Sequence, residues 1–83
     1  MTREELDRVL TEIFSDIFGK PGDSFGAGTN PDTLPEWDSL AHIRLISALE
    51  ERFDRRISLE DQVDMLSFEL IGDIMAAPDG GAG

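Results

Sequence analysis

The chain has 83 residues, which is enough for one domain and too few for a second hydrophobic core. It has no cysteine, which excludes disulfides and thiolate zinc sites, and its net charge of -11 argues against binding to nucleic acid phosphates. No apolar run approaches the roughly 20 residues that span a bilayer, and no signal peptide precedes the first helix. We therefore expect a cytoplasmic monomer with no nucleic-acid or membrane partner, whose acidity favours basic protein surfaces.

The first predicted element is an amphipathic helix that follows Thr2. Thr2 as N-cap and Glu5 three residues later form a capping box. Apolar residues then recur at the spacing of a helix that buries one continuous stripe. The members of this stripe are Leu6, Val9, Leu10, Ile13, Phe14, Ile17 and Phe18. Gly19 and Pro21 end the helix, because glycine accepts the left-handed C' position and proline cannot continue it.

Residues 19–38 are rich in glycine and proline and show no helix or strand period. A connection of this length is uncommon in a small domain and usually packs against it or has a function. We expect Phe25, Leu34 and Trp37 to anchor this long loop to the other helices.

A second helix is predicted from Ser39 to Phe53, with Asp38 as its N-cap. Its apolar residues suggest a buried stripe, with Leu45 to one side. The stripe comprises Leu40, Ile43, Ile46, Leu49 and Phe53.

Two further helices complete the prediction. A short one runs from Leu59 to Asp64 with Ser58 as N-cap, and the last starts at Ser67. The apolar residues that the last helix should bury are Leu70, Ile71, Ile74 and Met75. Pro78 should stop it, and residues 78–83 lack the apolar content to fold, which predicts a disordered tail. The fold class is therefore all-α, with three longer helices and one short helix.

The tripeptide Asp38-Ser39-Leu40 lies where the loop becomes the second helix. In this position it resembles the attachment site of the acyl carrier protein family, in which the serine carries a 4'-phosphopantetheine arm. The helix that follows, Ile57, the short acidic helix and the last apolar helix extend the resemblance over residues 2–76. The resemblance implies a small right-handed four-helix bundle with a long loop between helices one and two, and a carrier domain over residues 1–77.

Ser39 is thus the predicted site of covalent attachment, with coenzyme A as donor of the arm. The product would be a phosphodiester, an anion that the first turn of a helix stabilises by roughly 0.3–1 kcal/mol. A carboxylate beside a phosphodiester is repulsive, so Asp38 is not interpreted as a phosphate ligand. It caps the helix, or it also contacts a transferase, and the sequence leaves both roles open. The partners that the resemblance implies are a phosphopantetheinyl transferase and enzymes of the acyltransferase, ligase or ketosynthase type.

Several residues around Ser39 are candidates for partner recognition. Leu40 is either part of the core or an exposed contact for docking enzymes. Ile43 and Ile57 are predicted to be core residues whose outer edges line a path for an acyl chain.

The charge pattern departs from that of many fatty-acid carriers. Arg44 stands where those carriers commonly have an acid, which moves the expected acidic docking surface toward Glu60, Asp61 and Asp64. This departure favours a polyketide or other specialised-metabolite pathway over primary fatty-acid synthesis.

No catalytic constellation is evident, so we predict a non-catalytic protein without a metal site. His42 lies one turn from Ser39, but no nucleophile elbow or oxyanion hole accompanies the two, and we interpret it as a lone surface histidine. The alternative function is a small acidic helical adaptor that binds a partner protein, with Ser39 unmodified. It explains the charge and the amphipathic helices equally well.

Overall fold

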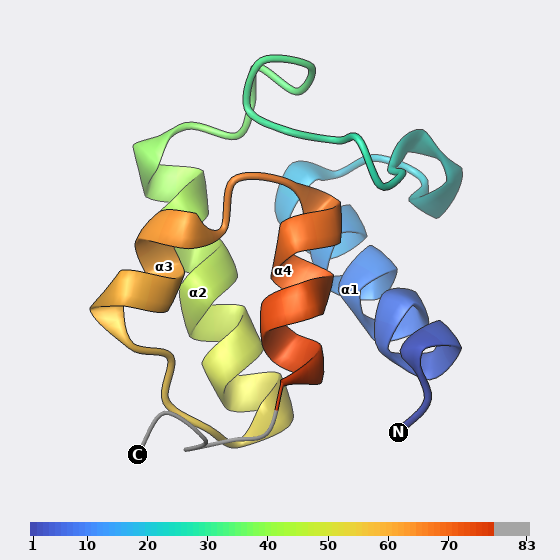
Figure 1. Cartoon of the computed structure of the whole chain (residues 1–83). Helices are drawn as coiled ribbons and strands as arrows, with labels where there is room; N and C mark the ends of the chain where they lie inside the picture. Colours follow the sequence, from blue (N-terminus) through green and yellow to red (C-terminus); the bar gives the residue numbers. More distant parts are fainter. Residues whose placement is uncertain (78–83) are drawn as a thin grey trace.

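The computed structural model describes residues 1–77, and within them all regular secondary structure is helical, with no strand. Four α-helices and one 3-10 turn follow one another along the chain (Figure 1). They are α1 (Arg3–Phe18), η1 (Gly22–Ser24), α2 (Ser39–Phe53), α3 (Leu59–Asp64) and α4 (Phe68–Ala76). The predicted all-α class with three longer helices and one short one is confirmed. The predicted tail, with Pro78, lies outside the described residues.

The helix ends follow from local hydrogen bonds. Thr2 Oγ1 accepts the Glu5 amide at 3.1 Å and Glu5 Oε1 accepts the Thr2 amide at 3.0 Å, which confirms the capping box. Gly19 ends α1 at φ +66°, in the left-handed region that favours glycine. Ser58 caps α3 as predicted, and Ser67 is the cap of α4 rather than its first residue.

A single hydrophobic core joins α1, α2 and α4 and includes two residues of the connection between α1 and α2. Phe14 is fully buried at its centre, with ring centroids of Phe25, Trp37 and Phe68 at 5.4, 5.4 and 5.0 Å. Leu34 and Trp37 are buried and Phe25 packs against the core, so all three predicted anchors are confirmed.

The side of α2 that faces the core differs in part from the predicted one, since Ile46 and Leu49 are buried and Phe53 packs against the core as predicted. Leu45 is fully buried, whereas Leu40 and Ile43 are 58% and 63% exposed. Each step along a helix turns it by about 100°, so the nine steps from Leu40 to Leu49 place these two residues about half a turn apart. The predicted spacing of three drifts around the helix in this way. The small residue Ala41, with Leu45 and Leu49, continues the true core side at a spacing of four.

The last helix also buries a partly different set of residues. Ile71 and Met75 are buried as predicted, but Leu70 is 42% exposed, and Ile74 is only partly buried against the core. Phe68, which we did not assign to the core, fills the place beside Phe14.

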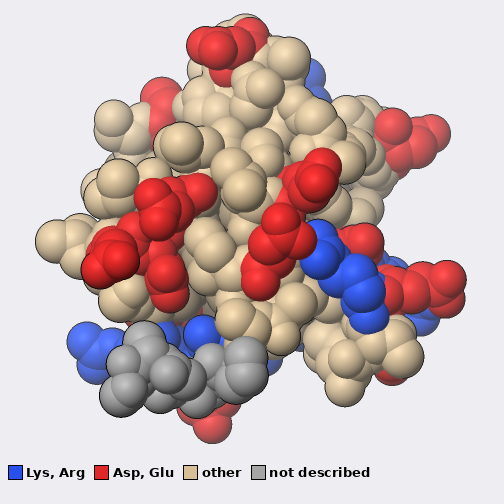
Figure 2. Space-filling model, viewed as in Figure 1, with Lys and Arg blue, Asp and Glu red and all other residues tan. Residues whose placement is uncertain are grey.

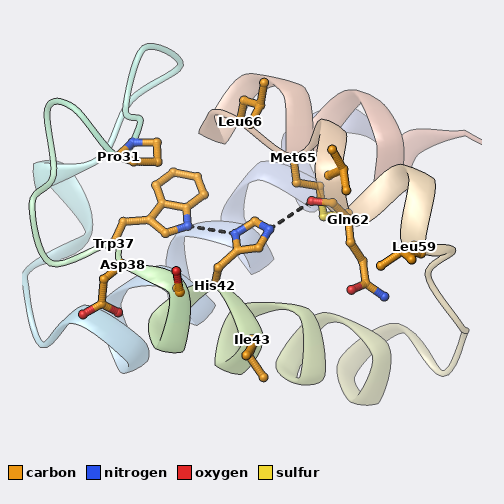
Figure 3. Close-up of a pocket in the computed structure, with 11 residues that line it drawn as sticks. Pro31, Trp37, Asp38, His42, Ile43, Leu59, Gln62, Met65 and Leu66 are labelled. Atoms are coloured by element: carbon orange, nitrogen blue, oxygen red, sulfur yellow. Dashed lines mark hydrogen bonds between the residues drawn. The ribbon is translucent and has the colours of Figure 1, made fainter.

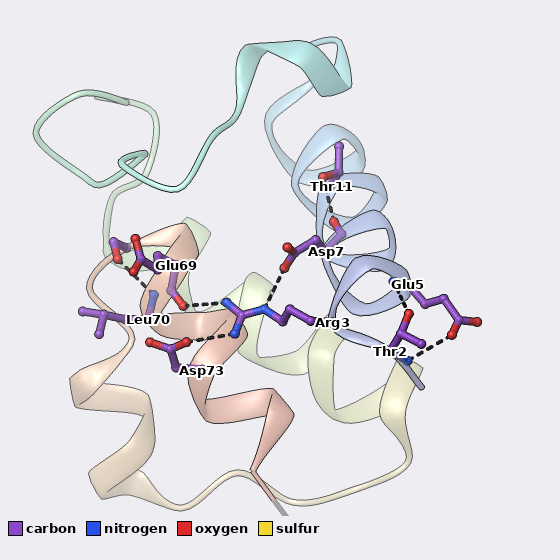
Figure 4. Close-up of polar contacts among 9 residues, drawn as sticks. Thr2, Arg3, Glu5, Asp7, Thr11, Glu69, Leu70 and Asp73 are labelled. Carbon is purple, nitrogen blue, oxygen red and sulfur yellow. Dashed lines mark hydrogen bonds and ion pairs between the residues drawn. The ribbon is translucent and has the colours of Figure 1, made fainter.

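Polar contacts tie α1 to α4 at the surface (Figure 4). Arg3 Nη1 binds Asp73 at 2.9 Å, Arg3 Nε binds Asp7 at 3.1 Å, and Arg3 Nη2 donates to the Glu69 carbonyl. A Cβ at Gly72 would meet this guanidinium, so a larger residue there would require the Arg3 side chain to shift. Exposed ion pairs contribute little free energy, so the core holds these helices together.

Candidate functional site

Ser39 is the first residue of α2 and is exposed. Before it, Asp38 has extended backbone (φ -97°, ψ -173°), and its Oδ1 accepts the Ala41 amide at 2.9 Å. The Asp38 carbonyl accepts the His42 amide as the first bond of the helical ladder. The amides of Ser39 and Leu40 lie outside this ladder, so the serine hydroxyl stands beside N–H groups at the positive end of a 15-residue helix.

The segment that leads into Ser39 is anchored. Trp37 is 4% exposed, and its ring meets that of Phe14 edge-on at 5.4 Å and 90°. The Trp37 amide donates to the Leu34 carbonyl at 2.9 Å. Glu36 accepts a hydrogen bond from its own backbone amide and binds Lys20 Nζ at 3.0 Å, and these contacts lower the pKa of Glu36. Ser39 is therefore presented from a packed base rather than from an open loop.

A groove of about 650 Å³ opens beside Ser39, between α2 and α3 (Figure 3). Its lining is mostly apolar, and four of its large apolar side chains are well exposed: Ile43, Leu59, Val63 and Leu66. Polar groups in the lining come from Asp38, Ser39, His42 and Gln62. The groove begins at the candidate attachment residue and has the chemistry to shelter an apolar group.

His42 is not the lone surface histidine that we predicted. Trp37 Nε1 donates to His42 Nδ1 at 3.0 Å, and His42 Nε2 lies 3.0 Å from the Gln62 carbonyl oxygen (Figure 3). The planes of the two rings differ by only 23°, with centroids 6.0 Å apart, so the rings lie edge to edge along this hydrogen bond. Both ring nitrogens are thus engaged by residues other than Ser39. Sequence spacing did not reveal this, because the partners lie in the preceding loop and on α3.

The remaining candidate residues divide between two sides of Ser39. Asp38 and Ile43 line the groove, so the prediction of a buried Ile43 is wrong and that of an acyl-facing edge stays a prediction. Leu40 and Arg44 lie on the other side, around a notch of about 240 Å³ next to the end of α1. Leu40 is exposed and so is not part of the core, and its role as a contact for docking enzymes stays a prediction. Ile57 is buried as predicted, at 5% exposure.

Acidic side chains gather over α3 and α4, with apolar surface between them (Figure 2). Glu60 is exposed and Asp61 is partly exposed in the first turn of α3, and neither lines the groove. The apolar groove residues Leu59 and Val63 were missed in the sequence. Their spacing of four, which places both on one side of a short helix, was the available signal, although acidic residues lie next to them in the sequence.

Known proteins give no further guide to the site. Neither a scan against protein-family models nor a search of curated proteins found a match for the chain. Within residues 1–77, no cluster of three or more His, Cys, Asp or Glu side chains could hold a metal ion. No helix of the same residues is long and apolar enough to cross a membrane. Any functional assignment therefore depends on the residues around Ser39.

Proposed function

We propose that the chain is an acyl carrier protein in which Ser39 bears 4'-phosphopantetheine and from which acyl groups are delivered to partner enzymes. The observation that carries this proposal is the exposed Ser39 at the start of a capped helix, directly beside an apolar groove. A right-handed bundle, a monomeric state and a cytoplasmic location belong to the same proposal.

The residues around Ser39 fit the arm. The hydroxyl is exposed, and the amides of Ser39 and Leu40 can stabilise a phosphodiester at the start of the helix. The Asp38 carboxylate accepts a hydrogen bond from the Ala41 amide, which partly offsets its repulsion of a phosphate on Ser39. When bound, the arm supplies a thiol that holds acyl groups as thioesters. The chain itself supplies the Ser39 hydroxyl, the segment that Trp37 anchors to the core, and the apolar groove.

Partner enzymes would recognise residues on both sides of the arm. Leu40 and Arg44 flank Ser39 on one side, and Ile43 flanks it on the other. Glu60 and Asp61, together with Asp64, make the outer surface of α3 acidic. We expect this surface to meet basic patches on a transferase and on acyl-loading and acyl-processing enzymes. Arg44 near the serine supports a polyketide or other specialised pathway.

The modification is tested by intact-mass spectrometry after incubation with coenzyme A, Mg²⁺ and a broad-specificity phosphopantetheinyl transferase. We expect the wild type to gain one phosphopantetheinyl group and Ser39→Ala to gain none. Ser47→Ala is the matched control, because Ser47 is an exposed serine on the same helix and its loss should leave the gain intact. If Ser39→Ala still gains the group, the assignment of the site is wrong.

The second candidate function is an adaptor that binds a partner helix. The exposed Leu59, Val63 and Leu66 in the groove favour it, because exposed apolar patches often mark protein contacts. A folded wild-type protein that gains no mass with several transferases would support the adaptor over the carrier.

The docking surface is tested with a cognate loading enzyme. We expect Asp61→Lys to slow loading of the modified protein and Arg44→Glu to alter its rate as well, because each variant reverses a charge on the proposed contact surface. If neither variant alters loading, the acidic docking surface on α3 is wrong even though Ser39 carries the arm.

A further inference from the structure

The helix α3 has little to hold it in place. It has six residues, and none of them is buried. So short a helix is unstable alone in water, because few hydrogen bonds repay the cost of its first turn. Buried residues occur only on either side of it, at Ile57 and Met65. Contacts from other elements to the backbone of α3 must therefore contribute to its position.

One such contact reaches α3 from α2. The carbonyl of Gln62 lies in the last turn of α3, where carbonyls lack an intrahelical partner. The Met65 amide reaches this oxygen at 3.4 Å, whereas His42 Nε2 lies at 3.0 Å. Gln62 also donates from its side chain to the Ile57 carbonyl at 2.9 Å, across the start of α3. His42 thus holds the residue that bridges both ends of this helix.

The groups bound to His42 on either side determine which of its ring nitrogens carries the proton. The Trp37 indole N–H can only donate, so His42 Nδ1 must accept and carries no proton. The Gln62 carbonyl can only accept, so Nε2 carries the proton and donates it. Only the neutral imidazole protonated at Nε2 makes both bonds. Trp37, His42 and Gln62 therefore form one directed chain of hydrogen bonds from the attachment segment to α3.

We propose that His42 is a positioning residue that clips α3 to α2 and links it to Trp37, two residues before Ser39. Because α3 forms the outer wall of the groove, this clip holds the wall next to the attachment residue. Loss of the clip leaves a polar group unpaired at each end and releases α3 from α2. That an acyl-bearing arm uses the groove rests on the proposed function, whereas the clip itself does not.

The chain has one histidine and one tryptophan, so the spectroscopic signals of both residues are assigned without ambiguity. Imidazole ¹⁵N NMR of the unmodified wild type should give the signature of a proton on Nε2. Trp37→Phe keeps an aromatic ring in the core but removes the indole donor, and it should relax this tautomer toward a mixture. A signature of a proton on Nδ1 in the wild type would overturn the proposal.

Amide hydrogen exchange measures the hold on α3. His42→Phe keeps a ring without hydrogen bonds, and α3 amides should then exchange roughly tenfold faster or more relative to those of α1. His42→Gln offers one acceptor and one donor and should recover part of the protection. Unchanged α3 exchange in a folded His42→Phe would overturn the clip. If His42→Phe does not fold, the tautomer in the wild type and in Trp37→Phe still decides.

These measurements need no arm on Ser39, so the two proposals can fail separately. A mass gain with the wrong tautomer would leave the carrier and remove the clip. The expected tautomer with no mass gain would leave the clip and remove the carrier.

Discussion

Replacing Asp38 separates its role as a helix cap from a role in recognition by a transferase. Its Oδ1 accepts the Ala41 amide at 2.9 Å, and its negative charge stands at the positive end of α2. Asp38→Ala removes both the hydrogen bond and the charge. Asp38→Asn keeps a side-chain oxygen for the Ala41 amide and removes only the charge.

The expected losses follow from these contacts. Loss of an N-cap typically costs about 1 kcal/mol, within a range of about 0.5–2. In a domain of this size, that corresponds to a fall of about 4–8 °C in Tm for Asp38→Ala. The charge at an exposed helix end contributes about 0.3–1 kcal/mol at low salt and less when screened. Asp38→Asn should therefore lose less free energy of unfolding than Asp38→Ala. The difference in free energy of unfolding between the wild type and Asp38→Asn should become smaller with added salt.

Urea denaturation followed by circular dichroism gives the free energies, with an unchanged m-value as the check for a similar denatured state. The rate of modification by the transferase is measured on the same samples. If Asp38→Asn is stable but is modified slowly, the transferase recognises the Asp38 carboxylate. If it is modified at the wild-type rate, Asp38 acts only as a helix cap. Equal destabilisation by both substitutions would refute the capping argument, since asparagine should keep the bond.

Three further predictions concern the fold. Leu45→Ala should cost about 2–5 kcal/mol of unfolding free energy, because Leu45 is fully buried. The exposed control Ile43→Ala should cost about 0.5 kcal/mol or less. Similar urea midpoints for the two variants would contradict the observed core side of α2. Glu5 accepts the Thr2 amide, which lowers the pKa of Glu5, so its contribution is present above the unfolded pKa and is lost as pH falls through the folded one. Glu5→Gln should therefore reduce the change in urea midpoint between about pH 6 and about pH 3, and an unchanged difference would exclude this linkage. Gly19→Ala should cost about 1–2 kcal/mol in thermal unfolding through its positive φ alone, because a Cβ there meets no atom within 4 Å; no loss would mean that the backbone adjusts freely.

Helix ends were the most predictable part of the fold from the sequence. Each depends on atoms a few residues apart, such as the Thr2 hydroxyl with the Glu5 amide or the Ser58 hydroxyl with the Asp61 amide. Local spacing is enough to specify such bonds. The predicted bounds of the helix Ser39–Phe53 and of the helix Leu59–Asp64 agree with the structure for this reason.

The orientation of the helices was less predictable. A helix with apolar residues on most sides can turn more than one of them inward, and the choice depends on what packs against it. In α2 the core takes Leu45 and leaves Ile43 at the groove, although both are large apolar residues of the same helix. The hydrogen bonds of His42 were hidden for the same reason, since Gln62 lies 20 residues away in the sequence.

The exposure of Ile43 bears on the choice between carrier and simple helix cap at Ser39. Full burial of an isoleucine is worth about 1.5–3 kcal/mol, so a chain shaped only for stability would gain by covering it. Instead Ile43 and Val63 both line the groove beside Ser39, and both side chains are more than 60% exposed. A serine that served only to start α2 would require no apolar groove beside it. An apolar group that lies in the groove for part of the time would account for the stability forgone there. Under the proposed function the arm on Ser39 would bring that group, whereas under the adaptor function a partner helix would.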